Sequence, residues 1–335
     1  MHYTLIKGTF HVVGQSPDGD SIKFRAADPR QWEKLDPQNH DQFVRNFTQE
    51  NGVVNLRLEG VDALETHFTP PADPAAPGIK PKGYAQPSTM GRAAANHFLD
   101  FMGVTEVKWR TFGYSAYIDE ATVNGTRLKD KLTDAIPGYI VTGDVEKNGR
   151  PVSWVFRGST SAADGIAITR DQLAKAVYSS ANYSLLRSGM VYPYFFMTLP
   201  AVVRGALAEA VRDAQATAAR MAAGAPTTNL WQIDDSVRGV NLSNVRVITE
   251  QRAILPYLFR KLIKHYQTLQ NARTSAAGGK PITDESIRLE GFFADGNPNI
   301  FVISEQDFLR LDDVVQVDGT QIRMRTTPQD LVFLS

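Results

Sequence analysis

The order of the hydrophobic patterns along the chain limits its fold more than any other feature of the sequence. In the first hundred residues apolar and polar side chains alternate with a period of two, as Val54, Leu56 and Leu58 do within residues 53–60, which is typical of β-strands. The middle of the chain instead repeats apolar residues at helical spacing. Strands followed by helices, rather than alternating with them, predict an α+β fold.

These patterns can be assigned to segments. The expected strands are 4–13, 21–26, 53–60, 104–110, 138–146 and 151–157. Three helices are expected. The first begins at Ser88 or Thr89 and ends before Gly103, and the other two cover 169–188 and 200–223. Asn148-Gly149 supplies the turn of a hairpin between the last two strands. Thr169 and Gln172 match a capping box, which favours a helix start at that point.

Three segments interrupt this pattern as insertions, at about 27–52, 67–88 and 112–135. The second holds six prolines and is expected to be a long surface loop, because proline disfavours the interiors of helices and sheets. Residues 236–335 read as a separate C-terminal α+β extension of unknown function. This extension is expected to contain a helix from Pro256 and four short strands, near 300–304, 314–317, 321–325 and 331–334.

The composition excludes several classes of site. The chain has no cysteine, so disulfides, thiolate-zinc sites and cysteine nucleophiles are ruled out. Thirty-six basic residues balance thirty-six acidic ones, which speaks against a generic nucleic-acid coat and leaves a local basic site open. The first twenty residues lack the pattern of a secretory signal, and no apolar run approaches about 18 residues. We therefore expect a cytoplasmic protein without a membrane partner; a secreted form stays open if the chain is a processed one.

Three carboxylates and an arginine follow the ends of neighbouring strands. Asp20 closes an Asp-Gly-Asp turn, and Arg57 precedes Asp62 and Glu65 at the end of a later strand. A hard cation such as Ca²⁺ prefers oxygen ligands, which Asp20 and Asp62 offer together. Glu65 can orient a water molecule, and the planar guanidinium of Arg57 suits a phosphate group. This combination indicates phosphodiester hydrolysis.

Each piece alone has a simpler interpretation. Asp-Gly-Asp is most often only a turn, and an arginine followed by two acidic residues is most often a solvated strand end. The segment is not an EF-hand, because its glycine comes too early. Only the ordered combination is specific.

In that combination the chain resembles the staphylococcal nuclease-like, or thermonuclease, family over about residues 5–235. The further motifs that carry the resemblance are Lys147-x-Gly149-Arg150, Leu185-Leu186-Arg187-Ser188-Gly189, Tyr192-x-Tyr194, an alanine-rich helix and Asn229-Leu230-Trp231. The resemblance implies a five-stranded OB-type β-barrel with packed helices, whose face binds single-stranded DNA or RNA.

The resemblance also implies roles for single residues. Asp20, Asp62 and the backbone carbonyl of Ala63 would hold Ca²⁺. Glu65 would be the general base, and Arg57 and Arg150 would bind the scissile phosphate. Lys147 would contact a terminal phosphate, and Tyr192 and Tyr194 would contact the substrate, although core packing is an equal reading for both tyrosines.

The chain departs from the family pattern at three places. Ala63-Leu64 replaces the usual Thr-Pro, Asn148 replaces a tyrosine, and the loop after Glu65 is enlarged, with His67 near its start. We expect that loop to reshape substrate access.

The functional expectation is a Ca²⁺-dependent nuclease that cleaves DNA, RNA or both. One alternative is a catalytically silent module that binds nucleic acid or protein. Another is a nuclease controlled by an inhibitor or by residues 236–335, which would then serve for a protein partner or self-association.

Overall fold

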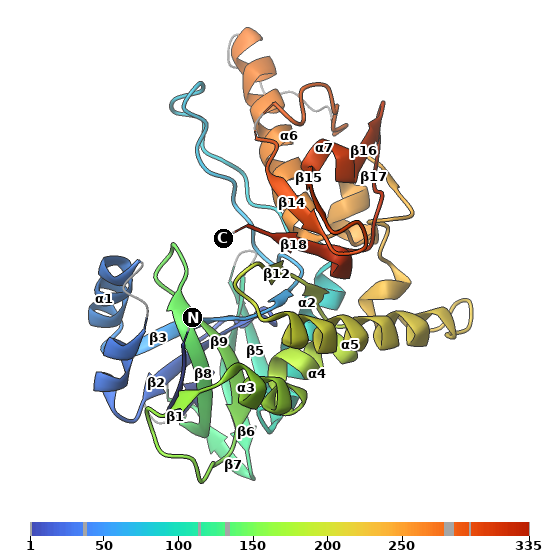
Figure 1. The fold of residues 1–335 in the computed structure, drawn as a ribbon. Helices are drawn as coiled ribbons and strands as arrows, with labels where there is room; N and C mark the ends of the chain where they lie inside the picture. Colours follow the sequence, from blue (N-terminus) through green and yellow to red (C-terminus); the bar gives the residue numbers. More distant parts are fainter. Residues whose placement is uncertain are drawn as a thin grey trace.

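A computed structural model describes residues 2–35, 39–112, 115–130, 135–277, 285–294 and 296–334 of the 335-residue chain. Five strands close into a β-barrel in the order β1-β2-β3-β9-β8, with β8 pairing back onto β1 (Figure 1). The barrel strands are β1 (Tyr3–His11), β2 (Ser21–Ala26), β3 (Val53–Leu58), β8 (Ile136–Val145) and β9 (Pro151–Arg157). Four of the five pairings are antiparallel, and β3 with β9 is parallel. The α+β prediction is confirmed, and the closed barrel is consistent with the OB type.

Two paired glycines allow this barrel to close tightly. Gly8 on β1 lies opposite Gly138 on β8. A β-carbon at Gly8 would collide with the backbone of Arg25, and one at Gly138 would collide with the ring of Phe10. The close approach of the strands therefore depends on the missing side chains.

The insertions carry structure of their own. The one between β2 and β3 holds η1 (Pro29–Lys34) and α1 (His40–Gln49). The strand expected at 104–110 belongs to β5 (Val104–Phe112), which forms a separate sheet with β6 (Ser115–Val123) and β7 (Thr126–Leu128). Part of the predicted insertion 112–135, namely 113–114 and 131–134, lies outside the described residues.

Helices pack around the barrel, as seen in the teal, green and yellow segments of Figure 1. They are α2 (Ser88–Phe101), α3 (Arg170–Ala176), η2 (Val177–Ser179), α4 (Ala181–Arg187) and α5 (Ala201–Ala219). The prediction of one helix over 169–188 was wrong. Ser180 has an extended backbone and its side chain accepts from the backbone N–H of Tyr183, so it ends one helix and caps the next. The expected cap of α2 at Ser88 or Thr89 was also wrong, because Pro87 occupies the cap position.

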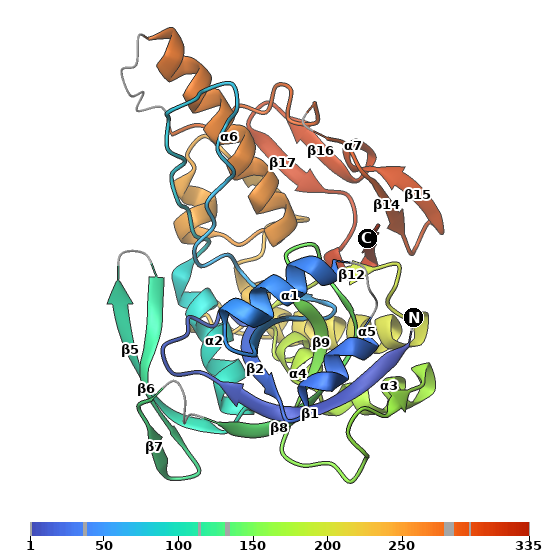
Figure 2. The ribbon, with the colours of Figure 1, turned by 90° about the vertical axis from the view of Figure 1, so that its left-hand side faces the viewer.

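The chain after α5 builds a second portion around one long helix, α6 (Pro256–Ala276). Its shorter elements are η3 (Leu230–Gln232), β13 (Val240–Asn241), η4 (Val247–Gln251), β14 (Asn299–Val302), β15 (Asp307–Arg310), α7 (Leu311–Val314), β16 (Val315–Asp318), β17 (Gln321–Met324), η5 (Pro328–Asp330) and β18 (Leu331–Phe333). Figure 2 shows this portion on one side of the barrel.

Short strands join the two portions. β12 (Phe195–Phe196) lies in a sheet of order β12-β18-β14-β15, so a segment that follows the barrel pairs with the last strand of the chain. Just before it, β11 (Tyr192–Pro193) pairs with β4 (Val61–Asp62). The buried apolar residues of both portions form a single core. In the described part of the chain, no helix has both the length and the apolar character needed to cross a bilayer.

Candidate functional site

Strand pairing brings the predicted acidic residues together. β2 and β3 are in register with Ser21 opposite Arg57, so Asp20 lies beside the end of β3, where its carbonyl accepts from Leu58 N at 2.8 Å. The chain then turns at Gly60, whose φ of 74° suits glycine, and β4 carries Asp62 back toward Asp20. We call Asp20, Asp62 and Glu65 the acidic cluster.

Arg57 joins the two aspartates of the acidic cluster. Its Nη1 donates to Asp20 Oδ2, and its Nη2 donates to Asp62 Oδ1 at 2.7 Å and to the Val61 carbonyl at 3.2 Å. The backbone N–H of Ala63 adds a bond to Asp20 Oδ2 at 2.9 Å. Two carboxylates on adjacent nitrogens of one guanidinium lie close to each other, and both are buried.

A second arginine, Arg260 on α6, reaches the same cluster. Its Nη2 donates to Asp62 Oδ2 at 2.9 Å, and its Nη1 donates to Asp62 Oδ1 at 3.2 Å and to Glu65 Oε1 at 2.6 Å. Asp62 therefore lies between two guanidiniums. Arg260 could not be identified from the sequence, because a single arginine on an amphipathic helix gives no local signal of a site.

Burial and the ion pairs shift the pKa values of the two aspartates in opposite directions. Burial raises the pKa of Asp20 well above its ordinary value, with Arg57 opposing and Asp18 and Asp62 adding to the shift. Burial also acts to raise the pKa of Asp62, but Arg260 and Arg57 outweigh it and hold that pKa below its ordinary value. Asp62 is thus the firmly ionised member of the pair.

Glu65 lies at the edge of the acidic cluster. Burial raises its pKa despite the contact with Arg260. Its side chain is still 23% exposed, whereas that of Asp62 is 1% exposed. Of the three carboxylates, Glu65 is therefore the most accessible to water.

Arg150 and Lys147 lie on the β8–β9 hairpin. Arg150 Nε donates to Glu146 Oε1 at 2.9 Å, and its side chain lines a cavity of about 190 Å³ together with Asp18, Ser21 and His67. Lys147 is exposed in the turn. Among the described residues, no hydrogen bond or ion pair connects Arg150 to the acidic cluster. The structure thus brings Asp20, Arg57, Ala63, Asp62 and Glu65 together. Arg150 lines a cavity beside residues that are close to Asp20 and Glu65 in the sequence, and its side chain bonds to Glu146.

The two predicted tyrosines differ in their surroundings. Tyr192 is fully buried, donates to Asp234 Oδ1 at 2.6 Å and packs on Trp231, so the core-packing reading applies to it. Tyr194 is partly exposed, its ring packs against Phe196 and Phe333, and the guanidinium of Arg260 lies 5.9 Å from its ring centroid. Tyr192 lies opposite Asp62 in the β11–β4 pairing, but its hydroxyl is bonded to Asp234, so of the two only Tyr194 has its ring beside Arg260.

The proline-rich loop 67–88 is held against α6. Within the loop, Phe68 and Tyr84 form a β-bridge, and their rings contact Phe259 and Tyr266 of α6. Gln86 links both sides of the site, because its Oε1 accepts from Glu65 N at 3.1 Å and its Nε2 donates to the carbonyl of Ile254 at 2.7 Å. In both ribbon views the loop runs along α6 (Figures 1 and 2).

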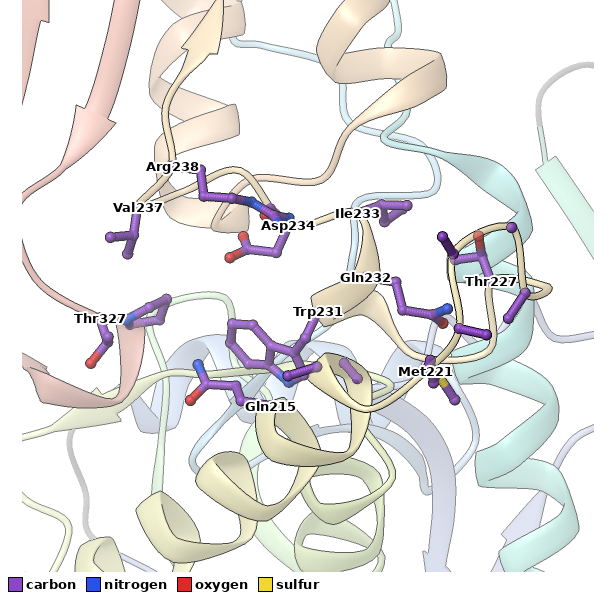
Figure 3. A pocket seen from close by; sticks show the side chains of 17 residues that line it. Gln215, Met221, Thr227, Trp231, Gln232, Ile233, Asp234, Val237, Arg238 and Thr327 are labelled. Carbon is purple, nitrogen blue, oxygen red and sulfur yellow. The ribbon is translucent and has the colours of Figure 1, made fainter.

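A larger cavity, of about 580 Å³, lies elsewhere. Figure 3 shows Trp231, Asp234 and Arg238 among its lining side chains, between the end of α5 and the segment at Thr327. Asp234 Oδ1 accepts hydrogen bonds from the hydroxyls of Tyr192 and Ser236, so this carboxylate has a structural role. No residue of the acidic cluster lines this cavity. We therefore place the candidate site at the acidic cluster, where opposite charges converge.

Comparisons with known proteins add no relative. No protein-family model matches the chain, and no curated protein matches it either. The geometry of the site and the sequence motifs are therefore what support a function for this protein.

Proposed function

We propose that the protein is a nuclease of the staphylococcal nuclease-like type, which hydrolyses phosphodiester bonds in DNA or RNA. The single observation that supports this is the meeting of Asp20 and Asp62 on one guanidinium, with Glu65 beside them. A closed five-stranded barrel is a scaffold suited to single-stranded nucleic acid. Tyr194 packs against Phe196 and Phe333, and its partly exposed ring beside Arg260 would be the aromatic contact for a base.

Asp20, Asp62 and Ala63 offer the oxygen ligands that Ca²⁺ prefers, although the described residues contain no group of three or more His, Cys, Asp or Glu side chains placed to hold a metal ion. Two buried carboxylates lie next to each other, and the backbone of Ala63 is in contact with one of them. Asp20, Asp62 and the carbonyl of Ala63 are the oxygen atoms that would hold the ion. Bound Ca²⁺ would polarise the phosphoryl group and stabilise the charge that develops on it.

The residues of the chain have distinct roles in this proposal. Arg57 holds a non-bridging phosphate oxygen through its guanidinium. Glu65 orients a water molecule and accepts its proton as the water oxygen forms a bond to phosphorus. The bond from phosphorus to the leaving nucleoside oxygen then breaks, and that oxygen takes a proton from solvent.

A nuclease assay on single-stranded DNA tests the proposal. We expect cleavage with Ca²⁺, none with chelator, and a loss of about 10²-fold or more in kcat for Glu65→Gln, because general base catalysis is worth about that much. Glu290→Gln, at an exposed position outside the cluster, is the control and should cleave normally. Full activity under chelation, or in Glu65→Gln, would contradict the mechanism.

The alternative is a catalytically silent module that binds nucleic acid or protein. One observation favours it: both oxygens of Asp62 are already paired with arginines, so the acidic cluster can be read as a structural ion-pair network. Such a module would bind single-stranded DNA without product, and Glu65→Gln would leave its affinity unchanged.

A further inference from the structure

The site contains two guanidiniums, and they come from opposite ends of the chain. Arg57 lies five residues before Asp62, whereas Arg260 lies 198 residues after it. Both contact the same carboxylate oxygen, Asp62 Oδ1. Any group bound at the acidic cluster would therefore meet both arginines.

The net charge of the site is compatible with a second phosphate-binding cation. When all three carboxylates are ionised, as they would be around a bound cation, they and the two arginines carry one net negative charge. A divalent cation together with one phosphodiester adds one positive charge, so the filled site is neutral with Arg260 and negative without it. Since buried net charge is costly, Arg260 suits the filled site.

Among the described residues, Arg150 makes no bond to the acidic cluster. It is paired with Glu146 on its own hairpin, and it lines the cavity with Asp18, Ser21 and His67. Arg260, in contrast, lies at the cluster and beside the ring of Tyr194.

α6 is packed firmly against the rest of the protein, so it does not resemble an inhibitory segment that moves out of the site to activate it. Phe259 and Leu258, which precede Arg260, are buried in the common core, and Pro256 begins the helix. The β12–β18 pairing and the Gln86 bonds connect this portion to the barrel end. Only the side chain of Arg260 needs to turn, and a fork that binds a carboxylate can bind phosphate oxygens in the same way.

We propose that Arg260 is the second phosphate-binding arginine of the site, so that residues after 235 complete the nuclease instead of restraining it. This inference rests on the proposed function and names an arginine that comes from outside the barrel. The substrate group it recognises is a phosphodiester of single-stranded nucleic acid.

The test uses the full-length chain and two measurements. The first is the affinity for a fluorescent single-stranded DNA in chelator, read as anisotropy, and the second is cleavage with Ca²⁺. Arg260→Ala should weaken DNA binding about tenfold, as expected for one lost charged contact, and lower kcat/KM about 10²-fold or more. Arg260→Lys should lose less, because it keeps the charge and loses the fork.

Two further variants sharpen the result. Arg252→Ala, at an exposed arginine paired with Asp235, is the matched control and should bind and cleave like the unmodified chain. Arg150→Ala should lose less than Arg260→Ala in both measurements. Calorimetric titration with Ca²⁺ alone should show no weaker binding in Arg260→Ala, because removing the arginine removes a competitor for Asp62.

The outcomes separate the inference from the nuclease proposal. Faster cleavage by Arg260→Ala would show that the arginine inhibits the site, and this would overturn the inference. Unchanged DNA affinity in Arg260→Ala would also overturn it. If the unmodified chain binds DNA without cleaving it, the nuclease proposal fails, and the anisotropy of Arg260→Ala still decides whether Arg260 binds phosphate. If the alanine variant does not fold, Arg260→Lys decides, and normal affinity and cleavage in that variant would overturn the inference.

Discussion

The barrel and the C-terminal portion each place one guanidinium at the acidic cluster, but by different means. In the barrel, Arg57 and the two aspartates are positioned by the pairing of β2 with β3 and by a tight turn at Gly60. In the C-terminal portion, Arg260 arrives on a long helix whose position depends on packing against loop 67–88. One half of the site is thus built by local strand geometry, and the other half by tertiary contacts.

Asp62 is where the two regions meet, and its removal should have the largest effect. Asp62→Ala leaves both guanidiniums partly buried without their shared partner. Because breaking a buried ion pair typically costs about 3–5 kcal/mol, we expect a loss of that order in the free energy of unfolding. Urea denaturation measures it.

Asp312→Ala is the control for that experiment. Asp312 pairs with Arg310 at the surface, where ion pairs contribute roughly 0–1 kcal/mol. If Asp62→Ala destabilised the protein no more than Asp312→Ala, the two regions would not depend on their common carboxylate.

Glu59 gives the next largest effect, and it belongs to the barrel alone. Burial, followed by the nearby charge of Asp144, raises the pKa of Glu59 from 4.5 to about 8. The unfolded chain therefore ionises Glu59 first, and the folded state loses stability as the pH rises from about 4.5 to about 8.

Glu59→Gln should remove this penalty. At pH 7 we expect a gain on the order of 3 kcal/mol in the free energy of unfolding, growing from pH 4.5 to pH 8 and constant above. Urea unfolding of Glu59→Gln and of the unmodified chain over that pH range measures the difference in unfolding free energy. The titration of other groups is the same in both proteins and cancels in that difference. Because the two regions share one core, the gain should appear in a single transition of the whole chain. A gain in only one of two transitions would show that the regions unfold separately.

Thr169 gives the smallest effect and tests a purely local signal. Its side chain accepts from Gln172 N at 3.2 Å, while Gln172 Oε1 accepts from Thr169 N at 2.8 Å. Thr169→Ala should cost about 1 kcal/mol of unfolding free energy, as a lost N-cap usually does. Thr169→Ser, which keeps the hydroxyl, should cost less. A loss equal to that of Asp62→Ala would contradict the view that this cap acts only on its own helix.

Much of the barrel could be predicted because its signals are local. The period-two pattern of residues 53–60 marked β3, and Asn148-Gly149 marked the β8–β9 turn. The meeting of Asp20, Arg57 and Asp62 follows from strand ends that pair side by side.

The remainder could not be predicted, since it depends on contacts distant in sequence. Arg260 is one arginine on a helix, and only the fold brings it to Asp62. Strand β15 was missed because Asp307–Arg310 is largely exposed and lacks clean alternation, and its pairing with β14 defines it. Tyr192 carried the same motif signal as Tyr194, but the pairing of β11 with β4 buries it.

The distance of α6 along the chain has a consequence for biosynthesis. A ribosome makes Asp20, Arg57 and Asp62 early, and it adds Arg260 only 198 residues after Asp62. Strand β18, which pairs beside Tyr194, comes later still. If the chain is a nuclease that requires Arg260 for turnover, a nascent chain that has folded only its barrel is inactive, and RNA near the ribosome is spared until α6 has been made and has packed in place.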